Sequence, residues 1–182
     1  LYLLRLDSMK PNWTKPDPSG LTSYQQSYAD LVPAGDLTSL LENNSGTSAK
    51  LLSTLPPDKL KFRYAPGKWS IPQILVHIID TERIFSYRIL CIARGDKTPL
   101  PGYEENDYAA ACNADQRDFK DILEEYQHVR RATISLLKSL TNAMLDNTGI
   151  SNNKSTSVRT LCYMLAGHEI HHLNVIKERY LK

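Results

Sequence analysis

Apolar residues recur at intervals of three and four along much of this 182-residue chain, the spacing of helices with one buried face. Asp36 is a predicted N-cap, and Ser70 with Gln73 forms a predicted capping box at the start of a second apolar stretch. Each long stretch would bury its apolar stripe against the others, which predicts an all-α fold. The four predicted long helices cover about residues 37–53, 71–93, 114–140 and 158–182.

Prolines, glycines and polar residues separate these stretches. Residues 1–23 are rich in proline and are expected to form an extended or partly disordered arm, followed by a short accessory helix at 24–32. Residues 96–113 form a long connection, and 142–157 is expected to be a polar loop without strands. The prediction is therefore an antiparallel four-helix bundle with one long crossover loop, forming a single domain from residue 24 to residue 182.

Composition excludes several classes of protein. The formal charge of +2 comes without any dense run of Lys or Arg, which argues against nucleic-acid binding. Apolar runs are too short to span a membrane. The three cysteines have no C-x-x-C spacing, which is typical of reduced thiols in the cytoplasm, and Cys162 is expected to be a buried structural thiol. We expect a cytoplasmic protein with no nucleic-acid or membrane partner.

Histidines occupy positions where the helical stripes would otherwise place leucines. His168 and His172 are four residues apart in the last helix, in register with Leu161 and Leu165, and His77 follows Ile74 in the second. A buried imidazole needs a partner, and a divalent metal accepts several of them. Three ligands from two packed helices would leave a position for water or substrate. The alternatives are histidines hydrogen-bonded in a dry core, or a His pair that reflects only surface composition.

Other residues are candidates for supporting roles. Asp80 and Glu169 are the carboxylates that could accept a hydrogen bond from the far N–H of a ligand ring. His171 points about 100° away from His172 and is expected to pack or to form an interface, while His128 is expected on the outer surface. The predicted pocket residues are Trp69, Tyr103 and Tyr108, although the two tyrosines could equally be packed down for burial.

Four short motifs resemble the DinB-like superfamily, which is grouped with YfiT-type proteins. They are Gly67–Ile71, His77–Arg83, Ala93–Gly102 and Ala166–His172. The resemblance covers about residue 24 to the end and implies an antiparallel four-helix bundle whose metal is held by His77, His168 and His172. Some relatives in this superfamily look like thiol-dependent transferases.

These patterns lead to one main hypothesis and two alternatives. The main hypothesis is a metal-dependent enzyme, a transferase or hydrolase, that binds zinc or nickel and acts on a small molecule with water or a low-molecular-weight thiol. The first alternative is a non-catalytic bundle that binds a metal or ligand in a stress-response or interaction role. The second is a purely structural dry core. Outward-facing Ile84, Tyr87 and Tyr163 also predict a homodimer.

Overall fold

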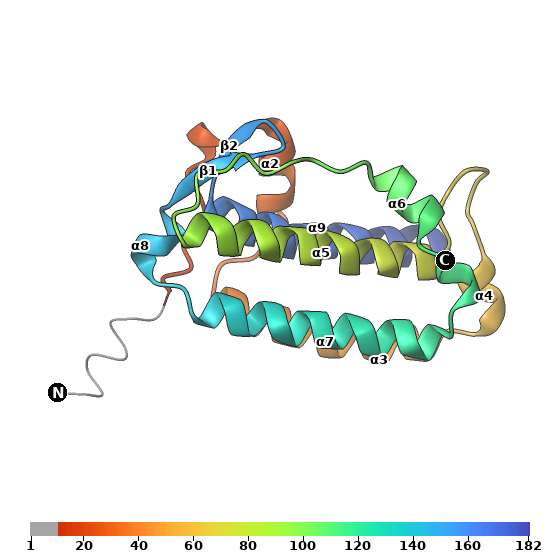
Figure 1. Ribbon diagram of the computed structural model, residues 1–182. Coiled ribbons are helices and arrows are strands. Elements are labelled where there is room, and N and C mark those ends of the chain that lie inside the picture. The colour runs from red at the N-terminus through yellow and green to blue at the C-terminus, as the bar shows by residue number, and fades with distance from the viewer. Residues whose placement is uncertain (1–10) are drawn as a thin grey trace.

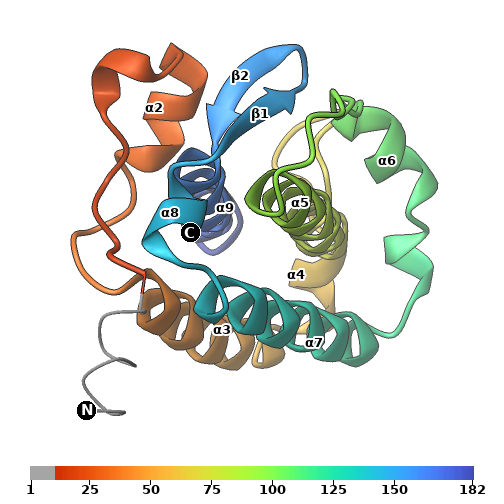
Figure 2. The same cartoon turned by 60° about the vertical axis from the view of Figure 1, so that its left-hand side comes forward.

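A bundle of four long helices forms the body of the computed structural model, which describes residues 11–182 (Figure 1). Helix α5 packs against α7 and α9, and α3 packs against the same two helices, so the four close around a common core (Figure 2). The predicted four-helix bundle is confirmed. Its members are α3 (Leu37–Ser53), α5 (Ile71–Ala93), α7 (Phe119–Lys138) and α9 (Val158–Val175).

Local capping explains where these helices begin. The Asp36 side chain accepts a hydrogen bond from the Ser39 amide at 2.7 Å, and Ser70 with Gln73 forms the capping box expected at the start of α5. Helix α7 begins later than predicted, because a 3-10 turn, η2 (Ala114–Gln116), precedes it and Asp118 is its N-cap. The last predicted helix is α9 followed by a π-helical turn, η3 (Ile176–Tyr180).

The crossover loop determines the direction of the helices. Residues 94–118 carry the chain back along the length of the bundle, so α5 and α7 run in the same direction in Figure 1. The loop contains a short helix, α6 (Glu105–Ala111). Its first part is held by main-chain hydrogen bonds, from the Leu100 amide to the Ile150 carbonyl at 2.9 Å and from the Asn152 amide to the Leu100 carbonyl at 3.0 Å.

The expectation of a strand-free loop at 142–157 was wrong. After a single helical turn, α8 (Asn142–Leu145), strands β1 (Thr148–Ser151) and β2 (Lys154–Ser157) pair as an antiparallel hairpin. Asn152 and Asn153 at its tip have φ angles of 50° and 60°, which asparagine tolerates better than most residues and which tight hairpin turns require. Strands of four residues are too short for a reliable alternating pattern, which is why the sequence did not reveal them.

The segment before α3 packs on the bundle. The predicted accessory helix is α2 (Ser23–Ala29), and it lies across α9. Gly167 permits this contact, because a Cβ atom there would lie 2.0 Å from the Tyr28 carbonyl oxygen. Trp13 is buried, and the Tyr163 hydroxyl donates to its carbonyl at 2.9 Å. Tyr163 is therefore an interior residue, and its predicted outward position was wrong. The expected arm before residue 11 lies outside the described residues.

A layer of buried polar side chains divides the core into two apolar clusters. On α7, Arg130 separates Tyr126 of one cluster from Ile134 of the other. On α5, the buried polar residue His77 lies between Val76 and Ile78, which belong to the same cluster as Tyr126, whereas Phe85 further along the helix belongs to the cluster of Ile134. A short helix α4 (Pro57–Lys61) lies between α3 and α5 in the chain. None of the helices formed by the described residues has the length and apolar character needed to cross a membrane.

Candidate metal centre and its cavity

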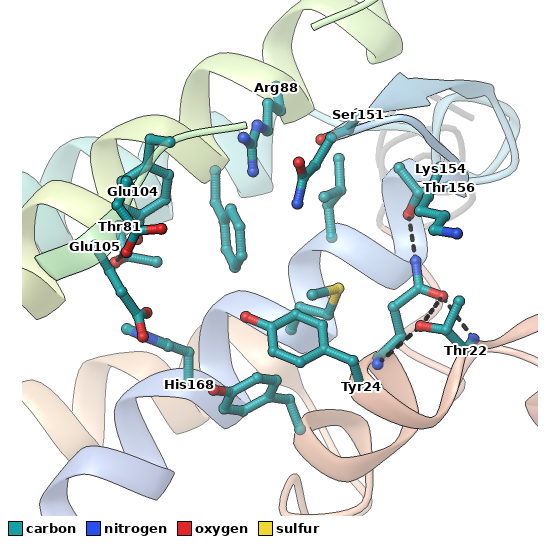
Figure 3. Close-up of a pocket in the computed structure, with 17 residues that line it drawn as sticks. Thr22, Tyr24, Thr81, Arg88, Glu104, Glu105, Ser151, Lys154, Thr156 and His168 are labelled. Atoms are coloured by element: carbon teal, nitrogen blue, oxygen red, sulfur yellow. Dashed lines mark hydrogen bonds between the residues drawn. The ribbon is translucent and has the colours of Figure 1, made fainter. Parts of the chain in front are cut away.

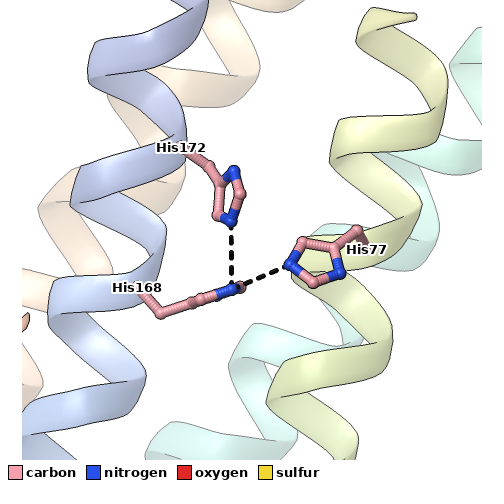
Figure 4. Close-up of side chains that lie close together, drawn as sticks. All are labelled: His77, His168 and His172. Carbon is pink, nitrogen blue, oxygen red and sulfur yellow. Dashed lines mark hydrogen bonds between the residues drawn. The ribbon is translucent and has the colours of Figure 1, made fainter. Parts of the chain in front are cut away.

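The three predicted ligand histidines converge in the middle of the bundle (Figure 4). The Nε2 atom of His77 lies 2.9 Å from Nε2 of His168, and Nε2 of His172 lies 3.1 Å from the same atom. His77 comes from α5, while His168 and His172 lie one turn apart on α9. We call these three residues the histidine triad. Its candidate ligand atoms all lie within 4.8 Å of one another.

Burial keeps the triad neutral at physiological pH. It lowers the pKa of His77 to about 4 and that of His172 to about 3, and it holds the pKa of His168 well below the ordinary value for histidine. The indole of Trp69 packs against His77 with ring centroids 4.8 Å apart and against His172 at 6.5 Å. Neutral imidazole is the form of histidine that binds metals.

The arrangement fits a cation better than a network of hydrogen bonds. Each Nε2 atom carries either one hydrogen or one lone pair in the plane of the ring. His168 uses this single atom for both of its contacts, so they cannot both be ordinary two-centre hydrogen bonds. A shared cation accepts all three lone pairs at once. Zinc–nitrogen bonds of 2.0–2.1 Å place tetrahedral ligand atoms roughly 3.3 Å apart, close to the two Nε2–Nε2 separations of 2.9 Å and 3.1 Å at His168.

A buried ion network lies beside the triad. Arg130 donates to Glu82 at 2.7 Å and to Glu169 at 2.8 Å, and Glu169 also accepts a hydrogen bond from Tyr126. All four side chains are buried, and the network joins α7 to both of the helices that carry the histidine triad. It thus connects α5 and α9 through a third helix.

The predicted supporting carboxylates have other partners. Glu169 belongs to the buried network, and Asp80 lies 3.6 Å from Arg83. Within residues 11–182, no hydrogen bond joins either carboxylate to a histidine of the triad. The other two predictions for histidine agree with the structure: His128 is exposed, and His171 packs edge-on against Tyr28 with ring centroids 5.7 Å apart.

A cavity of about 330 Å³ opens beside the triad, with His168 along its edge (Figure 3). Tyr103 lines it as predicted, and its hydroxyl group forms a 2.6 Å hydrogen bond with Thr81. Arg88, which the sequence did not single out, points into it from α5. The remaining walls come from α5, from α2 with its N-cap, and from the crossover, the hairpin and α9; they are Thr22, Tyr24, Gln25, Tyr28, Phe85, Glu104, Glu105, Ser151, Asn152, Lys154, Thr156, Leu161 and Met164.

The other two predicted pocket residues lie elsewhere. Trp69 lines a second cavity of about 260 Å³, together with His171 and His172. Tyr108 is 47% exposed, packs against Tyr103 and lines a third cavity of about 280 Å³, which Arg88 and Tyr103 also border. His168 borders the first cavity and His172 the second, so the histidine triad lies between two spaces that could admit small molecules. Glu105 borders both cavities.

Comparison with known proteins identifies the family of this chain. Residues 40–176, which run from α3 into η3, match the family model of the DinB superfamily. The chain belongs to the DinB superfamily. The resemblance predicted from its motifs is therefore confirmed.

Individual relatives differ in how closely they match. A protein of Oceanobacillus iheyensis, named as a putative metal-dependent hydrolase, is 26% identical over 139 residues, or 75% of this chain and 79% of that protein. The structure of YfiT from Bacillus subtilis, described as a probable metal-dependent hydrolase with an unusual four-helix bundle topology, superposes with a TM-score of 0.71 at 17% identity and covers 94% of each chain.

A more distant structural neighbour is the mycothiol-dependent maleylpyruvate isomerase. It superposes with a TM-score of 0.62 at 11% identity and covers 84% of this chain but only 62% of its own. At these identities the two structural matches establish a common fold.

Proposed function

We propose that this protein is a metal-dependent hydrolase that acts on a small molecule bound in the cavity beside His168. The observation that carries the proposal is the convergence of three neutral imidazoles on one point at the edge of a cavity of about 330 Å³. The names of the Oceanobacillus iheyensis relative and of YfiT support the same class of reaction.

The histidine triad would hold the metal, for which zinc and nickel are the candidates because imidazole accepts both. A divalent metal at this position supplies a Lewis acid that lowers the pKa of water or of a thiol. The chain itself would orient the ligand rings by packing Trp69 and Phe85 against them. Glu105 is the carboxylate placed to accept a proton, because it lines the spaces on both sides of the triad.

A thiol-dependent transferase is the second candidate. The observation that favours it is the shared fold with an isomerase whose name states a dependence on mycothiol. In that reading a low-molecular-weight thiol would take the place that water has in hydrolysis. A bundle that binds metal without catalysis and a dry structural core without metal are the remaining alternatives.

Metal analysis and turnover together test the proposal. Tag-free protein is reconstituted with zinc or nickel, dialysed and analysed for metal; we expect about one equivalent in the wild type, a large loss in His168→Ala and no loss in His128→Ala. His128 is a matched control because it is an exposed histidine on α7.

The reconstituted protein is then assayed against a panel of small esters, amides and lactones, and against monobromobimane with and without cysteine as the thiol. Hydrolysis without added thiol that is lost in His168→Ala supports a hydrolase. Turnover only with thiol supports the transferase, and metal binding without any turnover supports the non-catalytic bundle. A wild type that retains no metal would refute the proposal.

A further inference from the structure

Arg88 is a buried cation at the wall of the cavity. Its side chain is 6% exposed and extends from α5 into the cavity, where Figure 3 shows it between Thr81 and Ser151. One guanidinium nitrogen donates to the carbonyl oxygen of Pro101 at 2.6 Å, and the central carbon lies 5.7 Å from the centre of the Phe85 ring. Burial lowers the pKa of Arg88 below its ordinary value, because the charged form loses solvation.

No carboxylate in the described part of the chain forms an ion pair with this guanidinium. Arg130, which is 1% exposed, has two glutamate partners. The bond to Pro101 uses one of the five N–H groups of Arg88. Because no fully buried side-chain nitrogen of residues 11–182 lacks a partner, the other guanidinium nitrogens of Arg88 reach the spaces that it lines, which are this cavity and the third cavity of about 280 Å³ shared with Tyr108. Figure 3 shows the guanidinium directed into the first of these. A buried charge without a counterion is costly, which points to a ligand that supplies one.

We propose that Arg88 binds the carboxylate of a small molecule that occupies this cavity; the role of that molecule as substrate rests on the proposed function. A guanidinium presents a planar fork of donors that matches the two oxygens of a carboxylate. The charged residues that line the cavity are Arg88, Lys154, Glu104 and Glu105, so their formal charges cancel. This balance favours a ligand with one negative charge over a phosphate dianion.

The walls and size of the cavity define the rest of the ligand. Phe85, Tyr24, Tyr28 and Met164 offer aromatic and apolar surface. A volume of about 330 Å³ holds on the order of ten water-sized atoms, since one water occupies about 30 Å³. The ligand is therefore a compact monocarboxylate with an apolar body.

The same face of α5 connects the two ends of the cavity. His77, Thr81 and Arg88 lie on it at intervals of four and seven residues, with Phe85 between the last two. The Phe85 ring lies 6.4 Å from the His168 ring, so one aromatic side chain separates the guanidinium from the histidine triad. A molecule anchored by its carboxylate at Arg88 can thus present its other end to the triad.

Calorimetric titration of the full chain with 3-phenylpropionate, and with its neutral isostere 3-phenylpropionamide, tests the assignment. Both are measured in metal-free protein, so that any discrimination between them does not depend on the triad. We expect the carboxylate to bind at least tenfold more tightly than the amide in the wild type. Arg88→Gln should remove this preference. Arg88→Lys should keep part of it, because lysine retains the positive charge but lacks the planar pair of donors that matches a carboxylate. Arg94→Gln, which changes an exposed arginine just past the end of α5, should leave it intact.

Equal affinities for acid and amide in the wild type, or an unchanged preference in Arg88→Gln, would overturn the proposal. Inorganic phosphate is titrated in parallel, and tighter binding of phosphate than of the carboxylate would also overturn it. Circular dichroism melts confirm that each variant is folded. A protein that discriminates acid from amide but binds no zinc would retain the Arg88 site and lose the proposed hydrolase function, so the two failures are distinguishable.

Discussion

Replacement of Arg130 by methionine should destabilise the bundle strongly. Arg130 is 1% exposed and balances Glu82 and Glu169, whose side chains are 3% and 1% exposed. Methionine fills a similar volume but leaves two carboxylates without a cation in the core. Removing one partner of a buried ion pair costs about 3–5 kcal/mol, because the remaining charge stays desolvated.

This cost is a large fraction of the stability of a single domain, which is typically about 5–15 kcal/mol. For a chain of this size, each kcal/mol lowers the melting temperature by about 2–4 °C. We therefore expect Arg130→Met to melt roughly 6–20 °C below the wild type. The assay is urea denaturation followed by circular dichroism, with thermal melts as a second measure, both in the presence of a metal chelator.

Lys138→Met is the matched control, since it removes the cation of an exposed pair on the same helix. Lys138 lies 2.7 Å from Glu42, and both side chains are more than half exposed. An exposed pair contributes at most about 1 kcal/mol. If Arg130→Met lost no more stability than Lys138→Met, the buried network would not have the role assigned to it.

Three further predictions concern the triad and the packing around it. Metal-free protein should lose stability as pH falls from 6.5 toward 4, because the folded pKa values of about 4 for His77 and about 3 for His172 lie below the unfolded value. From these two histidines the unfolded chain binds up to two more protons, which gives a slope of up to about 2.7 kcal/mol per pH unit in urea titrations, and the lowered pKa of His168 adds to it in the same direction; a flat profile would contradict this prediction. Nickel should quench the fluorescence of Trp69, whose ring lies 4.8 Å from His77, and Trp69→Phe should abolish that quenching; quenching that persists would place the metal elsewhere. Gly167→Ala should cost about 1–3 kcal/mol, because its Cβ would meet the backbone of α2 at 2.0 Å. Gly46→Ala, with open space at its Cβ, should stabilise α3 by up to about 1 kcal/mol, and equal effects at the two sites in denaturant titrations would refute the close contact.

Local signals made the main helices predictable. Asp36, Ser70 and Gln73 form their caps with residues three positions away, so the starts of α3 and α5 follow from the sequence. The stripe positions of His77, His168 and His172 likewise predicted that these side chains face inward, and the structure brings them together. Helical periodicity predicts which side chains face inward, and side chains must face inward to form a cluster between packed helices.

Long-range partners could not be read in the same way. Glu82 and Glu169 are 48 and 39 residues from Arg130 in the sequence, so their pairing depends on how three helices pack. Arg130 does lie on the inward stripe of α7, in register with Tyr126, Thr133 and Leu137. Its charge made an exposed position the expected one. The role of Arg88 could not be predicted either. Its helical position indicates an inward side chain, but the cavity that it faces is formed by α2 and the hairpin, which are distant in the sequence.

The homodimer stays a prediction, and fewer exposed residues now support it. Tyr163 is buried, and of the three residues that suggested the interface only Tyr87 is more than half exposed. Light scattering at micromolar concentration measures the oligomeric state directly, and a monomeric mass would contradict the prediction.

Anomalous scattering from crystals of tag-free, zinc-loaded protein, recorded on both sides of the zinc edge, tests the metal centre most directly. We expect a single strong peak about 2.0–2.1 Å from the Nε2 atoms of His77, His168 and His172. Loaded crystals without a peak at that point, or with zinc bound only at other residues, would contradict it.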